Sequence, residues 1–266
     1  MRAVYADKFY KMFKVCLSFF LAMSLSLFVS AAEKEFYQIR IYHLKTEEQE
    51  NRLDSFLRIA YVPALHRNGI TQVGVFKPRP SDKTTERLLY VLVPFKSLKA
   101  LQKLDEKLAD DKLYQADGKG YLDAVYLSPP YERFETILLQ SFEGSKTTLP
   151  QLTGNKKDRV YELRSYEGYT EKIFGNKVDM FTKGDELGIF KRLGFNAIFY
   201  AEVIAGGRMP NLMYMTSFEN QAERDKHWEA FGKDPAWKKL SAAPEYQNNV
   251  SKIDMFMLYP VEYSDL

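Results

Sequence analysis

A short sequence pattern recurs along this chain at a nearly constant interval, and this repeat constrains the fold more than any other feature. FYQIRIYHL at residues 36–44 returns as VYELRSYEG at residues 160–168, an offset of 124. Further marks lie 124 or 125 residues apart, namely Tyr90 with Tyr214 and Arg67-Asn68-Gly69 with Arg192-Leu193-Gly194. Self-similarity at a fixed period indicates repeated structural units, so we predict a tandem duplication.

The first copy has a readable order of predicted elements. A strand rich in aromatic and β-branched residues at 36–44 precedes a helix that begins at Thr46 and ends at Gly69, because these residue types are favoured at those helix ends. Further strands are predicted at 71–77, 87–93 and 134–142, with a second helix from Ser97. We expect Pro63 to kink the first helix or end it early.

The second copy repeats this order. Its predicted strands lie near 159–166, 196–203, 211–217 and 252–259, and its helices cover about 170–193 and 219–231. A β-α-β-β-α-β order is ferredoxin-like. We therefore predict an α+β fold with two tandem ferredoxin-like domains, at 33–143 and 159–266, joined by a polar linker at 144–158. We expect the two sheets to pair within one chain.

The first 32 residues carry the whole net charge and the features of an export signal. The chain has 38 Lys+Arg and 35 Asp+Glu, and outside residues 1–32 the two signs balance at 34 each. A basic start, an uncharged apolar run at 15–29 and the small residues Ser30-Ala31-Ala32 are typical of a cleaved secretory signal peptide. We therefore expect a periplasmic or secreted protein, and the balanced charge argues against a nucleic-acid partner.

Cleavage of this segment at about residue 32 would also remove the single cysteine, Cys16. The mature chain would then have no disulfide, no thiolate nucleophile and no cysteine-ligated metal. The apolar run of 15 residues is shorter than the roughly 20 residues that span a bilayer as a helix. We therefore expect no membrane attachment after cleavage.

The first strand of each copy carries the strongest candidates for a binding site. One face of it is polar, with Gln38, Arg40 and Tyr42 in the first copy and Glu162, Arg164 and Tyr166 in the second. The other face is apolar, with Tyr37, Ile39 and Ile41 or Tyr161 and Leu163. We expect the apolar face to pack beneath the helices, and the polar face to meet the opposite sheet or a cavity between the sheets.

Two interpretations of the polar face stay open. In the functional interpretation, Arg40 and Arg164 bind an anionic group while Tyr42 and Tyr166 supply hydrogen bonds and ring faces. In the structural interpretation, each arginine and the neighbouring Glu or Gln satisfy each other in a buried network. The structural interpretation is favoured because buried charges must be paired.

The three histidines, His43, His66 and His227, show no H-x-x-x-H or H-x-H spacing, so no metal site is predicted. If the protein is an enzyme, Tyr42, His43 and His66 are the candidate proton donors or acceptors. His66 is also conceivable as an axial haem ligand. The simpler account is a polar histidine at a helix end, and the expectation is that no cofactor is bound.

Several segments resemble the NIPSNAP family, namely YELRSYEG, the Arg-x-x-Gly end of the first helix, LMYMTSFENQAERDKHWEAF and DPAWKKL. The second copy follows the family pattern over roughly 158–260, whereas the first copy has Asp111-Lys112-Leu113-Tyr114 in place of D-P-x-W. The resemblance implies a dimeric α/β-barrel-type ferredoxin-like domain, related in architecture to small antibiotic-biosynthesis-type monooxygenases. It implies no settled activity and no agreed catalytic residues.

Two functions from different classes fit these features. The first is an exported small-ligand-binding or scaffold module. The alternative is a cofactor-independent monooxygenase or isomerase acting on a small aromatic or polyketide-like compound, and the sequence does not decide whether the protein is an enzyme. A tandem pair can make within one chain the contacts that single domains make by dimerising. We therefore expect a monomer, with a homodimer through exposed sheet edges as the alternative.

Overall fold

The computed structural model describes residues 34–80, 86–143 and 145–266, and Lys34–Leu266 form one compact unit. The predicted signal peptide at 1–32, with Cys16, lies outside the described residues. Within the described ranges, no helix combines the length and the apolar character needed to cross a membrane.

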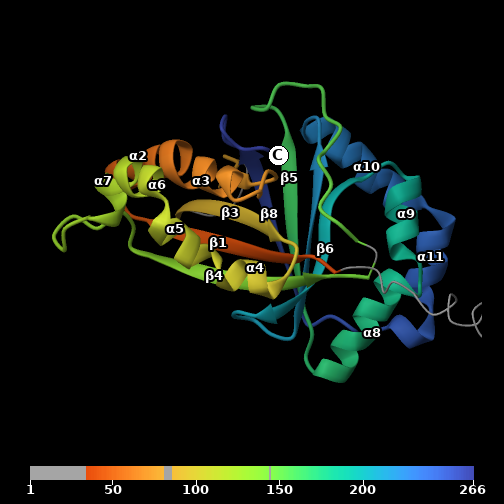
Figure 1. Ribbon diagram of the computed structural model, residues 1–266. Coiled ribbons are helices and arrows are strands. Elements are labelled where there is room, and N and C mark those ends of the chain that lie inside the picture. Colours follow the sequence, from red (N-terminus) through yellow and green to blue (C-terminus); the bar gives the residue numbers. More distant parts are fainter. Residues whose placement is uncertain (1–33, 81–85, 144) are drawn as a thin grey trace, which may run out of the picture. The chain divides into compact units, whose positions relative to one another are not determined.

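Eight strands of the described residues close into an antiparallel barrel, which Figure 1 shows with helices on its outside. The strands are β1 (Phe36–Leu44), β2 (Gly74–Pro78), β3 (Arg87–Phe95), β4 (Arg133–Ser141), β5 (Val160–Glu167), β6 (Asn196–Ala205), β7 (Asn211–Phe218) and β8 (Lys252–Pro260). Around the barrel they follow the order β1-β3-β2-β8-β5-β7-β6-β4.

Each half of the chain supplies neighbouring strands in the same local order, β4-β1-β3-β2 from the first half and β8-β5-β7-β6 from the second, as expected for β-α-β-β-α-β units. The halves meet at two seams, where Phe76 of β2 is opposite Pro260 of β8 and Leu139 of β4 is opposite Val203 of β6. The α+β class and the ferredoxin-like order are therefore confirmed. The division into two domains stays a prediction, because both halves belong to one compact unit.

The helices cover the outer face of the barrel, with one group over each half (Figure 1). Over the first half lie α2 (Glu47–Phe56), the π-helical turn η1 (Leu57–Tyr61), α3 (Val62–Arg67), α4 (Leu98–Gln102), α5 (Leu104–Asp110), α6 (Lys112–Asp117) and α7 (Lys119–Leu122). Over the second half lie α8 (Glu171–Thr182), α9 (Glu186–Arg192), α10 (Gln221–Lys233), α11 (Pro235–Ala242) and the 3-10 turn η2 (Pro244–Tyr246).

The sequence prediction for the two faces of β1 and β5 was wrong. The apolar face points into the barrel, and the face with the arginine and tyrosine packs beneath the helices. Tyr37, Ile39 and Leu163 lie inside the barrel in an apolar cluster that combines side chains of both halves. Tyr42 and Tyr166 lie outside it, beneath the helices. The interior of a small barrel is filled by side chains, so apolar residues belong there, whereas the helices can supply partners for polar groups.

The repeated residues Tyr90 and Tyr214 are not structurally equivalent. Tyr90 is opposite Ile41 and belongs to the cluster inside the barrel, while Tyr214 is opposite Arg164 and packs beneath the helices. The repeat has slipped by one residue in this strand, and a slip of one residue exchanges the two faces of a strand.

The first helical segment passes Pro63 instead of ending there, because the π-helical turn η1 comes immediately before it and α3 continues beyond it. Proline lacks an N–H and clashes with the carbonyl four residues earlier, and a wider turn accommodates both defects. The helix predicted over 170–193 is instead two helices, α8 and α9, which part at Asp185 with a φ of 64°.

Glycine ends the first helical segment of both halves, as predicted for Gly69. Gly69 and Gly194 have φ of 79° and 75°, a left-handed conformation that glycine adopts without strain. Gly69 N–H donates to His66 O at 2.9 Å, and Gly194 N–H donates to Lys191 O at 3.1 Å. These matched ends make His66 and Lys191 equivalent positions.

Residues 261–266 continue from β8 along the start of β2. Val261 N–H donates to Val75 O, and Asp265 N–H donates to Val73 O, both at 3.0 Å. Leu266 is only 1% exposed and packs in the cluster inside the barrel. This segment therefore extends the hydrogen bonding of the sheet and covers part of the apolar interior.

We predict that Leu266→Ala lowers the free energy of unfolding by about 2–4 kcal/mol, because it removes a buried side chain and leaves a cavity. The matched control is Leu149→Ala, which deletes the same atoms from a side chain that is 48% exposed and should cost less than about 1 kcal/mol. Equilibrium urea unfolding measures both losses. Equal losses would contradict the role assigned to residues 261–266.

Candidate functional site

Arg40 and Arg164 occupy equivalent places, each beneath the helices of its own half. Arg40 lies on β1 between β3 and β4, and Arg164 lies on β5 between β7 and β8. The apolar interior of the barrel separates the two outer faces. The structure therefore contains two candidate sites, one in each half, and does not bring the two arginines together.

In the second half, the guanidinium of Arg164 is neutralised by Glu162 of the same strand. Arg164 Nε donates to Glu162 Oε1 at 2.6 Å. Arg224 of α10 donates to both oxygens of Glu162, through Nη2 at 2.9 Å and Nε at 2.8 Å, and Trp228 Nε1 donates to Oε2 at 2.7 Å. The ring of Trp228 also lies 3.6 Å from the Arg164 guanidinium. Each oxygen of the fully buried carboxylate thus accepts two hydrogen bonds.

Both acids near Arg164 have shifted pKa values. Burial alone would raise the pKa of Glu162, but the hydrogen bonds and charges of Arg224 and Arg164 outweigh it and hold this pKa below its ordinary value. Glu186 of α9, whose pKa is raised by burial, also acts on the charge of Arg164 and pairs with Lys177 at 3.1 Å. The second half therefore contains its own counter-ions.

In the first half, the equivalent place has no carboxylate. Gln38 replaces Glu162, and Arg40 Nε donates to Gln38 Oε1 at 3.0 Å. Counting back from the matched helix ends, Tyr61 replaces Glu186. Among the residues that the structure describes, no Asp or Glu pairs with Arg40. Neutral side chains thus stand at the two positions that are acids in the second half.

Aromatic rings surround Arg40 where acids would otherwise stand. Its guanidinium lies 5.3 Å from the ring centre of Tyr61 and 5.7 Å from that of Phe134, and Tyr42 and Tyr121 also act on its charge. The hydroxyl of Tyr61 is buried and has no hydrogen-bond partner among the described residues. A buried hydroxyl without a hydrogen-bond partner, here beside the half-buried Arg40, costs free energy of folding. The described residues therefore supply no hydrogen-bond partner for the Tyr61 hydroxyl.

The tyrosines at this place are neutral hydroxyls near pH 7. Burial raises the pKa of Tyr61 above its ordinary value, although the charge of Arg40 opposes the shift. Burial also raises the pKa of Tyr114 to about 12. Such hydroxyls can donate hydrogen bonds to an anion, but they do not accept protons as general bases at neutral pH.

The residues predicted as catalytic candidates lie apart. Tyr42 is beside Arg40 beneath the helices, whereas His43 projects from the opposite face of β1, where its Nδ1 and Nε2 contact Glu86 at 3.0 Å and Glu135 at 2.8 Å.

His66 Nε2, at the end of α3, contacts Asp265 at 2.9 Å, a contact that an axial haem ligand would have to give up. In the second half, His227 Nδ1 contacts the carbonyl of Glu223 at 2.7 Å. No group of three or more His, Cys, Asp or Glu in the described part of the chain could hold a metal ion.

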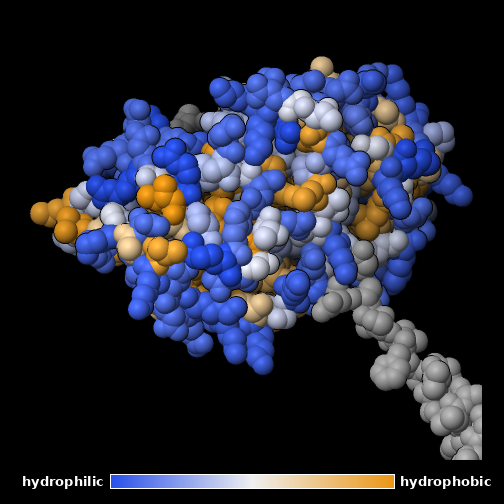
Figure 2. All heavy atoms as spheres, turned by 45° about the horizontal axis from the view of Figure 1, so that its top comes forward, coloured by the Kyte–Doolittle hydropathy of each residue, from blue (hydrophilic) through white to orange (hydrophobic). Residues whose placement is uncertain are grey.

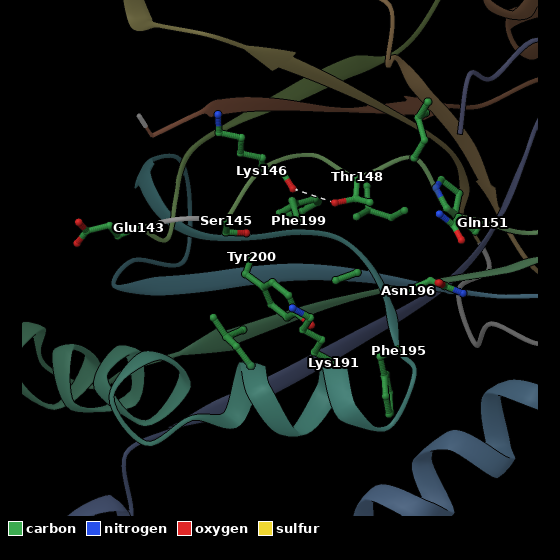
Figure 3. Close-up of a pocket in the computed structure, with 15 residues that line it drawn as sticks. Glu143, Ser145, Lys146, Thr148, Gln151, Lys191, Phe195, Asn196, Phe199 and Tyr200 are labelled. Carbon is green, nitrogen blue, oxygen red and sulfur yellow. Dashed lines mark hydrogen bonds between the residues drawn. The ribbon is translucent and has the colours of Figure 1, made fainter. Parts of the chain in front are cut away.

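A separate open cavity of about 560 Å³ lies at the start of β6, between α9 and residues 145–151 (Figure 3). Apolar side chains form much of its wall, among them Leu149, Pro150, Leu187, Phe195 and Phe199. Figure 3 shows Lys191 rising from α9 toward β6. The sequence analysis singled out none of the residues that line this cavity.

Sequence reasoning found Arg40 and Tyr42 but missed Tyr61, Tyr114 and Tyr121, which approach from the helices. A usable signal was present in the repeat itself. Comparing the copies position by position shows which acids are present in one copy and absent from the other, as Gln38 illustrates. For the helices, the comparison requires that the end at Gly69 be aligned with the end at Gly194, and the structure provides this alignment.

Comparisons with known proteins agree with this architecture. The family model NIPSNAP matches residues 161–265, and a comparison with curated proteins finds no match. Two solved structures, candidate monooxygenases from Lactobacillus acidophilus and Fusobacterium nucleatum, are 12% and 6% identical to this chain, with TM-scores of 0.57 and 0.56. Each comparison covers 86% of this chain, with 94% of the first protein and 93% of the second.

At these identities, the likeness to the two monooxygenases shows a common fold. A NIPSNAP domain protein from Burkholderia xenovorans is 16% identical, with a TM-score of 0.34, and the match covers 39% of this chain and 95% of that one. The family match falls on the half that carries YELRSYEG and DPAWKKL, as the sequence resemblance predicted. Residues 161–265, in the second half of this chain, therefore form a NIPSNAP domain.

Proposed function

We propose that this protein is a small-ligand-binding module, and that its first half binds an anionic molecule with an aromatic ring at Arg40. The observation that carries the proposal is the contrast between the halves. Arg164 has the buried carboxylate of Glu162 as its partner, whereas no described acid pairs with Arg40. A ligand carboxylate or phenolate would neutralise Arg40 in the first half as Glu162 neutralises Arg164 in the second.

Physical chemistry favours such a ligand over a neutral one. A guanidinium offers several N–H donors in a planar arrangement that suits a carboxylate. The hydroxyl of Tyr61 is free to donate to the same anion, and the ring of Phe134, which is 41% exposed, offers a face for an aromatic ligand. A ligand anion at this place would gain free energy, because the described residues supply no acid for Arg40 and no partner for the Tyr61 hydroxyl.

Binding is a better fit than the alternative of a cofactor-independent monooxygenase or isomerase. Proton abstraction needs a base at the site, but Tyr61 and Tyr114 have raised pKa values and His43 is on the other face of the strand. The fold shared with candidate monooxygenases does not by itself carry an activity.

The proposal also covers the history and location of the protein. We propose that the halves are two copies of one NIPSNAP-like unit, the second keeping an internal counter-ion and the first having lost it. The predicted signal peptide at 1–32 supports a location outside the cytoplasm, and we propose that the ligand is met there.

One prediction from the proposed site concerns stability. Gln38→Glu gives Arg40 an internal carboxylate and should raise the free energy of unfolding by about 1–3 kcal/mol at neutral pH. Glu162→Gln makes the reverse change in the second half and should lower it by about 3–5 kcal/mol, because it leaves buried arginines uncompensated. Urea unfolding measures both variants. A Gln38→Glu protein less stable than the wild type would contradict an uncompensated Arg40.

The same pair of variants has a defined pH dependence. Because the folded-state pKa of Glu162 is lowered, its contribution to stability is complete above the unfolded pKa of about 4.3 and is lost as pH falls through the folded-state pKa. The stability difference between the wild type and Glu162→Gln should therefore shrink in acid. A difference that stays constant as the pH is lowered well below about 4 would show that the carboxylate charge is not the cause.

The second prediction concerns binding, with benzoate as the probe and benzamide as its neutral analogue in isothermal titration calorimetry. We expect benzoate to bind at least about tenfold more tightly than benzamide. Gln38→Glu should weaken benzoate binding by at least about tenfold, because the new carboxylate occupies Arg40. The matched control Arg164→Gln should leave benzoate affinity within about threefold of the wild type.

Three outcomes would overturn the proposed site. They are equal affinity for benzoate and benzamide, an unchanged benzoate affinity in Gln38→Glu, and a larger loss in Arg164→Gln than in Gln38→Glu. The variant Gln38→Glu is expected to be more stable than the wild type, so loss of binding in it cannot be attributed to unfolding.

A further inference from the structure

β4 and β8 are followed by the same turn, and then by segments that run along equivalent strand edges. After β4, Phe142 N–H donates to Tyr200 O, and Ser145 N–H donates to Phe142 O. After β8, Val261 N–H donates to Val75 O, and Ser264 N–H donates to Val261 O. All four distances are 3.0 Å. Residues 145–151 therefore lie against β6 in the way that residues 261–266 lie against β2.

Along β2, the chain itself supplies a carboxylate and an apolar side chain to this edge. Asp265 Oδ2 accepts from Val73 N–H at 2.8 Å and contacts His66 Nε2 at 2.9 Å. The next residue, Leu266, is buried. One backbone N–H and one basic side chain thus hold a carboxylate, and an apolar group follows it into the protein.

Along β6, the basic side chain that contacts the carboxylate has a counterpart. Lys191 takes the place of His66, as the matched helix ends establish. Ile198 takes the place of Val73, since its carbonyl accepts from Thr148 N–H at 3.2 Å.

No carboxylate stands at the place of Asp265 at this edge. Asp265 N–H donates to Val73 O, and the residue that donates in the same way to Ile198 O is Thr148. Glu143, which follows Phe142, also lines the cavity. In the part of the chain that the structure describes, neither Lys146 nor Lys191 pairs with an acid. What lies between these groups is the cavity of about 560 Å³, a volume within the range of small-molecule sites.

We propose that this cavity binds a small apolar carboxylic acid. Lys191 Nζ holds the carboxylate as His66 Nε2 holds that of Asp265, and Lys146 adds a second positive charge. The apolar part of the acid lies against the side chains of Leu187 and Phe195. Figure 3 shows α9, which carries Lys191, beside β6. This site is distinct from Arg40, which is not among the residues that line the cavity.

Octanoate and its neutral analogue octanamide test this proposal in isothermal titration calorimetry of the purified protein. We expect octanoate to bind at least about tenfold more tightly than octanamide. Lys191→Ala should weaken octanoate binding by at least about tenfold, whereas Lys172→Ala, which removes an exposed lysine of α8, should change it by less than about twofold. Lys191→Arg keeps the charge and should retain most of the affinity.

A second variant tests the equivalence with Asp265. Thr148→Asp places a carboxylate where the first half has one, and it should compete for Lys191 and lower octanoate affinity by more than Thr148→Ala does. Octanoate bound at Arg40 would be insensitive to Lys191→Ala. An unchanged octanoate affinity in Lys191→Ala would therefore place the ligand outside the cavity and overturn the proposal. Undetectable octanoate binding, equal affinity for octanamide, or equal effects of Lys191→Ala and Lys172→Ala would also overturn it.

Discussion

A guanidinium held between a sheet and a layer of helices must meet negative charge or acceptor oxygens, and this requirement organises both halves of the protein. In the second half, Glu162 meets it, and α10 contributes Arg224 and Trp228 to complete the hydrogen bonds of the carboxylate. In the first half the acid is absent, and tyrosines converge on Arg40 instead. The same backbone thus supports one network with an internal carboxylate and one in which no described acid pairs with the arginine.

Much of the fold could be predicted from the repeat and from the periodicity of each strand. Phe36–Leu44 was predicted to the residue, and the remaining strands to within a few residues. Alternation shows which residues share a face, but it does not show which face points inward, because both faces are buried in a barrel covered by helices. The assignment of Tyr37 and Arg40 to the wrong faces has this cause. The slip at Tyr90 is a further example, since an offset in sequence need not be an offset in register.

The site was less predictable than the fold. Arg40 and Tyr42 stand out in a nine-residue strand, but Tyr61 comes from a π-helical turn and Tyr121 from a short helix, and nothing in their local sequence connects them to Arg40. The role proposed for the cavity beside Lys191 rests on the equivalence of His66 and Lys191. That equivalence becomes visible once the two helix ends are matched. Both proposed sites therefore rest on differences between the halves, and the repeat identifies the positions to compare.

The seams of the barrel also determine how the chain can reach this structure. Phe76 pairs with Pro260, 184 residues further along the chain, so the first half cannot close its sheet until the last strand is available. Contacts of such large sequence separation slow folding, because loop closure costs entropy before the contacts form. Until then, the edges of β2 and β4 are open to pairing with other chains. Completion of the barrel is thus one late event shared by both halves, and the places around Arg40 and Lys191 acquire their final shape together.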